Sequence, residues 1–253
     1  MSFLDRIRPA KRREVRLLQE APPATDWAPD VRSLHEVLKG RRKLSFIAEI
    51  KRRSPSRGDL RKGAEPISVA RAYEAAGASA ISVLTDGPHF GGALRDLVKV
   101  RAAVGIPVLR KDFILDELQL DETRAIGADA ALLIVAFLKP ARLTRLLAHA
   151  HEIGLEVLVE THDDEEVRLA LDAGARIVGT NNRNLHSLQV DLAVSEALLP
   201  AIPRGVLKVA ESGLKTRTDA RRMFAAGAHG VLVGTALMAQ PDVGEALKQL
   251  GCG

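Results

Sequence analysis

Residues 76–85, "AGASAISVLT", join the end of a predicted helix to an apolar, partly β-branched run. The same pattern returns at 126–135 ("IGADAALLIV"), 173–181 ("AGARIVGTN") and 226–234 ("AGAHGVLVG"). The repeated glycines are separated by 50, 47 and 53 residues, at Gly77, Gly127, Gly174 and Gly227. Each fits a helix C′ position, where glycine accepts the left-handed conformation without Cβ strain. The repeat therefore predicts four helix–strand junctions at even spacing.

A second set of predicted strands lies between these junctions. They are "FIAEIK" (46–51), "PVLRK" (107–111), "EVLVE" (156–160) and "LKVAE" (207–211). The two sets interleave into eight strands, each followed by a helical segment, within roughly 210 residues. This arrangement predicts an α/β protein with a (β/α)₈ TIM barrel, which usually takes ~250 residues. A doubly wound sheet is the alternative, but it does not require such even spacing.

The N-terminal segment has a different character. Residues 3–19 and 31–39 read as short helices, separated by a loop with three prolines, "EAPPATDWAPD". The chain is thus expected to divide into a helical extension over 1–43 and a (β/α)₈ barrel over 44–253. The net charge of +5 resides wholly in residues 1–43, because the remaining residues hold 26 charges of each sign. A solvated basic helix face accounts for this surplus better than a nucleic-acid site, since aromatic residues make up only 3% of the chain.

The sequence favours a cytoplasmic protein with no membrane partner. The longest apolar run, 130–138, is ended by Lys139-Pro140 and is too short to span a bilayer. The N-terminus is basic and shows no apolar signal-peptide core. The single cysteine, Cys252, excludes an intrachain disulfide and is typical of a reducing compartment.

Charged residues end the second set of strands. Lys51, Lys111, Glu160 and Glu211 end strands 1, 3, 5 and 7, and Glu49 precedes Lys51 by two residues on the same strand face. In a barrel, alternate strands contribute to the same interior layer, so we expect these side chains to converge at the carboxyl ends of the strands. A structural ion pair would explain any one of them. All five together, on the face where barrel active sites lie, favour catalysis.

Two further motifs suggest how a ligand is held. "ESGLKTR" (211–217) and "GTALM" (234–238) follow strands 7 and 8, where this fold commonly binds phosphate, and Gly213 and Gly234 would let the backbone approach. The Ser54-Pro-Ser56 turn would add hydroxyl donors. In "TNNRNL" (180–185), Asn181 and Arg183 are suited to hydroxyls and a carboxylate. Ordinary turns and a surface arginine are the alternatives.

Several other chemistries are disfavoured. The histidines are scattered, His149 and His151 would face different sides of a helix, and there is no cysteine pair for a metal. A P-loop, a G-x-G-x-x-G fingerprint and a nucleophile elbow are also missing. The residues point to a cofactor-free acid–base enzyme acting on a phosphorylated small molecule.

Taken together in order, "IAEIKRRSPSRG", "PVLRKDFI", "EVLVETH", "TNNRNL", "VAESGL" and "GTALM" resemble the indole-3-glycerol phosphate synthase family. The resemblance covers residues 44–240, and the N-terminal helices resemble the family's extension over the barrel mouth, the opening at the carboxyl ends of the strands. It implies conversion of 1-(2-carboxyphenylamino)-1-deoxyribulose 5-phosphate to indole-3-glycerol phosphate, CO₂ and water, in tryptophan biosynthesis, by a carboxy-lyase without a cofactor.

The resemblance also implies roles for individual residues. Lys111 would protonate the substrate ketone, and Lys51 would pair with the anthranilate carboxylate and later help to expel hydroxide. Glu160 and Glu49 would supply acid–base function and hold the lysines. The substrate-binding residues would be Asn181 at the sugar hydroxyls, Arg183 at the carboxylate and Glu211 in the pocket lining. The phosphate-binding residues would be Ser54, Ser212, Gly213, Gly234 and Thr235. Decarboxylation needs apolar walls around the aromatic ring, for which we expect Phe113, Leu132, Ile134 and Leu185.

Three positions depart from the family pattern, namely Gly87, Leu118 and Asn184, and they concern loop packing more than catalysis. Another phosphosugar barrel, such as phosphoribosylanthranilate isomerase, would be expected to show a Cys and Asp pair instead of the two lysines and Glu160. A basic, non-catalytic nucleic-acid-binding barrel would show binding that weakens steeply with salt. We expect a monomer with no nucleic-acid partner, and a homodimer is the alternative.

Overall fold

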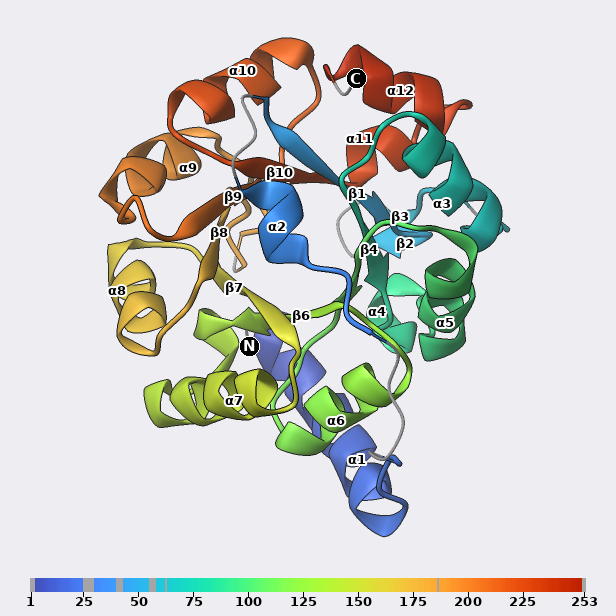
Figure 1. Ribbon diagram of the computed structural model, residues 1–253, viewed down its shortest axis with the longest axis vertical. Coiled ribbons are helices and arrows are strands. Elements are labelled where there is room, and N and C mark those ends of the chain that lie inside the picture. The colour runs from blue at the N-terminus through green and yellow to red at the C-terminus, as the bar shows by residue number, and fades with distance from the viewer. Residues whose placement is uncertain are drawn as a thin grey trace.

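The computed structural model describes residues 3–24, 30–39, 43–54, 58–61, 63–185 and 187–251. Eight parallel strands form a closed barrel in the order β1-β10-β9-β8-β7-β6-β5-β4 (Figure 1). These strands are β1 (Ser45–Ile50), β4 (Ala80–Leu84), β5 (Val108–Lys111), β6 (Ala130–Ile134), β7 (Glu156–Thr161), β8 (Ile177–Asn181), β9 (Leu207–Glu211) and β10 (Gly230–Val233). The prediction of a (β/α)₈ barrel is confirmed.

Helices surround the barrel and alternate with its strands. The long ones are α3 (Pro66–Ala75), α5 (Leu94–Ala103), α6 (Glu117–Ala125), α7 (Pro140–Glu152), α8 (Asp164–Asp172), α10 (Arg217–Ala225) and α12 (Val243–Gln249). The short ones are α4 (Gly87–Phe90), α9 (Ala193–Leu198), α11 (Thr235–Met238), η1 (Val135–Phe137) and η2 (Leu199–Ala201). The four repeated glycines follow α3, α6, α8 and α10, each with φ between 82° and 98°. They occupy the left-handed positions that the repeat predicts.

A small hairpin interrupts the loop after β1. Its strands, β2 (Arg53–Ser54) and β3 (Gly58–Asp59), pair antiparallel, and sequence periodicity gave no sign of such short strands. Ser54 belongs to β2, whereas Ser56, the other serine of the predicted turn, lies outside the described residues.

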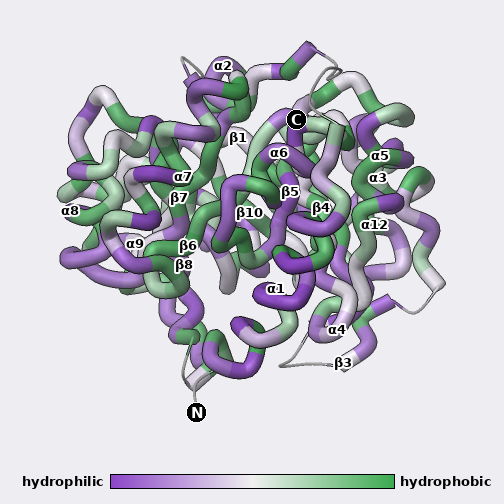
Figure 2. The backbone as a smooth tube through the Cα atoms, turned by 90° about the horizontal axis from the view of Figure 1, so that it is seen from below, coloured by the Kyte–Doolittle hydropathy of each residue, from purple (hydrophilic) through white to green (hydrophobic). Residues whose placement is uncertain are grey.

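The described residues of the N-terminal segment form two helices at opposite ends of the barrel. Helix α1 (Phe3–Glu20) lies at the end that also carries α4 and β3, and α2 (Leu34–Leu38) lies at the other end (Figure 2). In α2, the backbone N–H of His35 donates to Glu156 at 2.8 Å, and Leu38 packs where Gly230 begins β10. Because Glu156 and Gly230 are the first residues of their strands, α2 closes the amino end of the barrel. The expectation that the whole extension covers the mouth therefore does not hold for α2.

Two apolar clusters make up the core. One lies between the barrel wall and the surrounding helices. The other fills the barrel interior and includes side chains from both N-terminal helices, namely Phe3, Leu4 and Ile7 of α1 and Leu34 and Leu38 of α2. Burial on this scale contributes roughly 25 cal/mol per Å² of apolar surface. The two helices thus act as caps on a continuous barrel core.

Candidate active site

A cavity of about 700 Å³ opens at the carboxyl ends of the barrel strands. All sixteen residues predicted for the site line it, namely Glu49, Lys51, Ser54, Lys111, Phe113, Leu132, Ile134, Glu160, Asn181, Arg183, Leu185, Glu211, Ser212, Gly213, Gly234 and Thr235. The barrel therefore brings together residues that are as far as 186 positions apart in the chain. A volume of this size suits a small molecule.

Lys111 stands between two buried carboxylates. Its Nζ lies 3.1 Å from Glu160 Oε2 and 3.6 Å from Glu211 Oε2, across β5, β7 and β9. Burial alone would lower the pKa of Lys111, but nearby carboxylate charge, chiefly that of Glu160, outweighs it and raises that pKa. Lys111 is consequently held in its ammonium form at neutral pH.

The two carboxylates around Lys111 differ in their surroundings. Burial would raise the pKa of Glu160, yet Lys111 outweighs it, so the pKa of Glu160 lies below its ordinary value. Burial raises the pKa of Glu211 to about 8, because neither of its oxygens has a hydrogen-bond partner among the described residues. Gly179 of β8 makes room for Glu211, since a Cβ at that position would collide with Glu211 Oε1. One carboxylate is thus ionised at neutral pH while the other retains a proton.

Lys51 forms a second lysine–glutamate pair in the same cavity. Its Nζ lies 2.5 Å from Glu49 Oε1, as expected for residues two apart on one strand face. Glu49 in turn packs against Gly234 at the start of α11, where a Cβ would lie 2.9 Å from the Glu49 Cβ. The end of β1 and the loop after β10 therefore fit together only with glycine at position 234.

The five residues predicted for phosphate lie on neighbouring strand ends. Ser212 and Gly213 follow β9, Gly234 and Thr235 follow β10, and Ser54 follows β1, which pairs with β10. Ser212 has φ 64°, uncommon for a residue other than glycine, and Ser54 Oγ is buried without a hydrogen-bond partner among the described residues. Hydroxyl and backbone N–H donors are thus available at this side of the cavity.

The rest of the cavity wall combines polar and apolar groups. Asn181 Oδ1 accepts from the backbone N–H of Arg183 at 3.0 Å, and the Arg183 guanidinium donates to the carbonyl of Leu188 at 2.9 Å. Phe113 packs edge-on against Phe3 of α1, with ring centroids 6.2 Å apart. The aromatic contact places α1 directly on the cavity wall.

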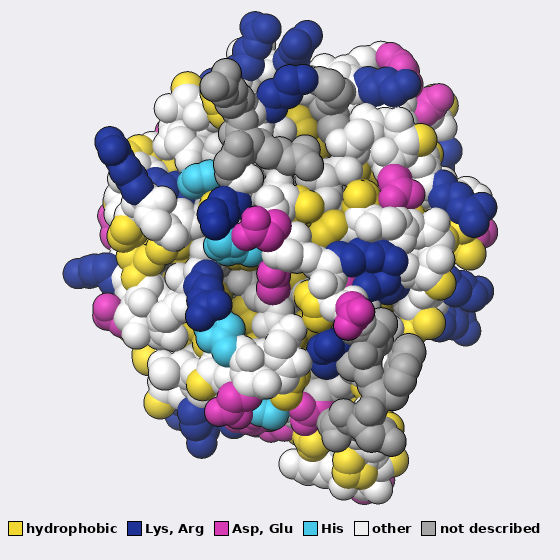
Figure 3. Space-filling model, in the orientation of Figure 1, with side chains coloured by type: hydrophobic (Ala, Val, Ile, Leu, Met, Phe, Trp, Pro, Cys, Tyr) yellow, Lys and Arg dark blue, Asp and Glu magenta, His cyan; other side chains and the backbone are white. Residues whose placement is uncertain are grey.

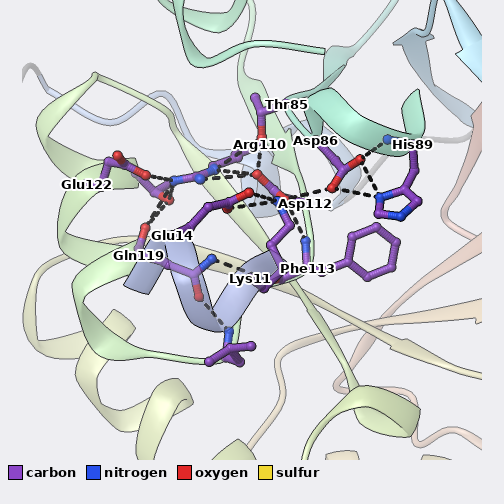
Figure 4. Close-up of polar contacts among 12 residues, drawn as sticks. Lys11, Glu14, Thr85, Asp86, His89, Arg110, Asp112, Phe113, Gln119 and Glu122 are labelled. Atoms are coloured by element: carbon purple, nitrogen blue, oxygen red, sulfur yellow. Dashed lines mark hydrogen bonds and ion pairs between the residues drawn. The ribbon is translucent and has the colours of Figure 1, made fainter. Parts of the chain in front are cut away.

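A buried polar network fastens α1 to this wall (Figure 4). Lys11, only 1% exposed, lies 2.6 Å from Asp112 Oδ1, 3.2 Å from Asp86 Oδ2 and 2.9 Å from Glu14 Oε2. Asp112 also pairs with the Arg110 guanidinium at 3.1 Å. Burial would raise the pKa of Asp112, but Arg110 and Lys11 outweigh it and hold that pKa far below its usual range. Lys11 is therefore a buried anchor, whereas Arg6, Arg12, Arg13 and Arg16 of the same helix form the exposed basic face that the sequence predicts.

Sequence reasoning missed Lys11, Gly179 and His162. The signal for His162 was available, because it follows Glu160 by two residues and so points to the same side, as Lys51 does relative to Glu49. Metal ligation has no support in the part of the chain described, where no three His, Cys, Asp or Glu side chains are grouped to hold an ion. Nor is any described helix long and apolar enough to cross a bilayer.

Fold and cavity together define a (β/α)₈ barrel with charged side chains gathered at the carboxyl ends of its strands, where the enzymes of this fold have their active sites. A model of the family described as indole-3-glycerol phosphate synthase matches residues 4–250. The chain belongs to this family.

Individual relatives agree with the family match. The indole-3-glycerol phosphate synthase of Chlorobium phaeovibrioides is 47% identical over 250 residues, covering 96% of this chain and 97% of that protein. The protein of the same name from Parafrankia sp. is 53% identical, covering 85% and 80% of the two chains. Among solved structures, thiamine phosphate pyrophosphorylase from Pyrococcus furiosus matches with a TM-score of 0.62 at 21% identity, covering 86% of this chain and 96% of that one. At that identity the likeness concerns the fold alone.

Proposed function

We propose that the cavity carries out the indole-3-glycerol phosphate synthase reaction in tryptophan biosynthesis. The enzyme closes the ring of 1-(2-carboxyphenylamino)-1-deoxyribulose 5-phosphate, then releases CO₂ and water to give indole-3-glycerol phosphate. The observation that carries this proposal is the ammonium of Lys111 held between Glu160 and Glu211 inside an apolar-walled cavity. Ring closure requires a proton at the ketone oxygen as the aromatic carbon attacks it, and this group is suited to give one.

Lys111 is the proposed general acid. An ammonium is a useful acid only if it remains charged until the ketone oxygen begins to carry negative charge, and Glu160 secures that charge. Glu160 also fixes the direction of the Lys111 side chain, since their contact of 3.1 Å has hydrogen-bond geometry. Glu160, which is ionised, then receives the proton that the ring loses in the dehydration step.

Lys51 is the proposed partner of the substrate carboxylate. Ring closure creates a positively charged intermediate that loses CO₂, so the carboxylate must be bound without being held more tightly than the transition state. Lys51 pairs with Glu49, and Arg183 offers a planar guanidinium in the same cavity. After decarboxylation, Lys51 assists the departure of hydroxide by donating a proton.

The remaining residues position the substrate. Ser54, Ser212, Gly213, Gly234 and Thr235 bind its phosphate, and Asn181 contacts the sugar hydroxyls. Phe113, Leu132, Ile134 and Leu185 surround the anthranilate ring, where the low dielectric strengthens the electrostatic interactions of the lysines. Helix α1 is the proposed lid over this region, through Phe3 and the Lys11 anchor, while residues 44–253 form the catalytic barrel.

A direct assay tests the reaction. The purified chain, given the carboxyphenylamino substrate without added metal or cofactor, should develop indole fluorescence with release of one CO₂ per product. The variant Lys111→Met should show none of this signal above background. An inactive wild-type chain, folded by circular dichroism, would reject the proposal.

We also infer a cytoplasmic monomer that binds no nucleic acid. The single cysteine supports the compartment. On the face seen in Figure 3, Lys and Arg side chains are scattered over both the centre and the edge and are interspersed with acidic ones, which does not resemble a continuous basic groove. Light scattering gives the mass directly, and a dimer would correct this inference without affecting the reaction.

A further inference from the structure

His162 lies directly behind the glutamate that contacts Lys111. It follows β7, and its Nε2 is 3.5 Å from Glu160 Oε1, while Glu160 Oε2 faces Lys111 at 3.1 Å. The two oxygens of one buried carboxylate therefore each face a different cationic side chain. His162 does not line the cavity, so it acts on the substrate only through Glu160.

The other ring nitrogen of His162 faces a second carboxylate. Glu166, in the first turn of α8, accepts from His162 Nδ1 at 3.0 Å and from the His162 backbone N–H at 2.7 Å. A neutral imidazole donates from one nitrogen and accepts at the other. With a carboxylate oxygen on each side, a neutral ring would direct a lone pair at one of them. Nε2 makes no hydrogen bond among the described residues, so its contact with Glu160 at 3.5 Å is an attraction between charges, which only the imidazolium provides.

These contacts form a line of alternating charge. It runs from Glu166 through His162 and Glu160 to Lys111, with contacts of 3.0, 3.5 and 3.1 Å, and the protonated Glu211 lies 3.6 Å from Lys111 at the end of the line. Such a line resembles the arrangement in which an orienting group holds an acid–base residue in its working direction. We propose that His162 is a positioning residue that keeps Glu160 ionised and directed at Lys111, so that Lys111 is poised to give up its proton to the substrate. This inference rests on the proposed function of Lys111 and Glu160.

The charge state of His162 supports the geometry. Burial alone would lower the pKa of His162, but the hydrogen bond to Glu166 and the charge of Glu160 outweigh it and raise that pKa above its ordinary value. The ionisable groups that face this line come from three strands and one helix, namely Lys111 of β5, Glu160 of β7, Glu211 of β9 and Glu166 of α8. As pH rises through the pKa of His162, Nε2 becomes an acceptor and repels Glu160.

Enzyme activity should depend on the protonation of His162, and the direction of this dependence can be stated. The turnover number kcat should fall as pH rises through the pKa of His162, because Glu160 loses its second cationic neighbour. The titration of Lys111 lies at higher pH, since its pKa is raised, and the pKa of Glu211 is about 8 in the wild type. The charge of His162 lowers the pKa of Glu211, so loss of that charge should move the titration of Glu211 upward, away from that of His162. A comparison of wild type with a variant changed only at His162 therefore shows which fall in kcat along the pH profile is due to His162.

The test compares His162→Gln with the wild-type enzyme over pH 5.5–9.5. We expect kcat of the variant to be roughly ten- to a hundredfold lower with a smaller change in KM, less than the ~10²–10⁴-fold of losing the proton donor itself. The fall in kcat that accompanies deprotonation of His162 should be absent from the pH profile of the variant. The matched control is His149→Gln, which removes another carboxylate-paired histidine, 2.7 Å from Asp121 on the outer helices, and should leave the profile unchanged. An identical profile shape in wild type and His162→Gln would overturn the proposal.

A second measurement needs no catalysis. Imidazole resonances followed by NMR against pH, with His162 assigned through His162→Gln, should give it a pKa above the ordinary value of ~6.5. The conservative change Glu166→Gln keeps an acceptor but removes its charge, and it should lower that pKa and shift the fall in kcat to lower pH. A His162 that is neutral at pH 6.5 in the wild type would overturn the inference. An inactive wild-type enzyme with a charged His162 would instead count against the proposed reaction.

Discussion

Lys11 of α1 lies 2.6 Å from Asp112, the residue directly after Lys111 in the chain. The side chains on both sides of this contact are almost completely buried. The contact joins the N-terminal helix to the strand end that carries the proposed acid. Removal of Lys11 would leave Asp86, Asp112 and Glu14 with one cation fewer in a low-dielectric interior.

We therefore expect Lys11→Met to lower the free energy of unfolding by about 3–5 kcal/mol, as measured by urea denaturation. The control is Lys39→Met, which removes an exposed lysine 3.8 Å from Glu36 and should change stability by less than ~1 kcal/mol. Equal effects from the two substitutions would show that the Lys11 network does not anchor α1.

Deletion of residues 1–20 tests the lid role of α1. The deletion leaves α2 in place at the amino end of the barrel, so the helical circular dichroism signal should persist. Turnover should fall at least tenfold or KM should rise comparably, because Phe3 and Phe113 no longer close the cavity wall together. The exposed double variant Arg12→Ala/Arg13→Ala should retain activity. Full activity after the deletion would show that α1 is not a lid.

Gly234→Asp tests the phosphate site. The new side chain would collide with Glu49 and place a negative charge beside the proposed anion site. KM for substrate and the inhibition constant for inorganic phosphate should both rise at least tenfold. The matched change Gly205→Asp enters open space and should leave both constants unaltered. Normal phosphate inhibition in Gly234→Asp would place the phosphate elsewhere.

The raised pKa of Glu211, about 8, predicts a pH dependence of stability. The folded state binds a proton that the unfolded state has lost above pH ~4.5, so Glu211 should reduce stability progressively between pH 4.5 and 8 and constantly above pH 8. Glu211→Gln imitates the protonated form. Its unfolding free energy should improve relative to wild type by about 2–4 kcal/mol between pH 5 and pH 9, measured by denaturation at both pH values. An unchanged difference would show that Glu211 is ionised in the folded state.

The sequence predicted the barrel because local signals and the global fold agree. The glycines after α3, α6, α8 and α10 mark helix ends, and strand alternation placed Glu49 with Lys51 and aligned Lys111, Glu160 and Glu211 on one interior layer. The same alternation along β7 would also have predicted that His162 lies on the same side as Glu160.

Other features depend on contacts that periodicity does not contain. The sequence "PAKRREV" places Lys11 among arginines and so predicts a solvated lysine. In the structure, Lys11 is buried and contacts three carboxylates. Helix α2 follows α1 closely in the chain, yet Glu156 and Ser45 fix it to the opposite end of the barrel. Which end a short helix covers is decided by tertiary contacts such as that of His35 with Glu156, 121 positions away.

The central claim is that Lys111 gives the proton for ring closure, and single-turnover kinetics of Lys111→Met and Lys51→Met tests it most directly. Lys111→Met should lose ring closure by ~10²–10⁴-fold with a modest change in substrate affinity, because its proton is needed only in the transition state. Lys51→Met should lose affinity as well as rate and should let a ring-closed intermediate accumulate. A Lys111→Met enzyme that closes the ring at near the wild-type rate would contradict the account and assign the acid to Lys51.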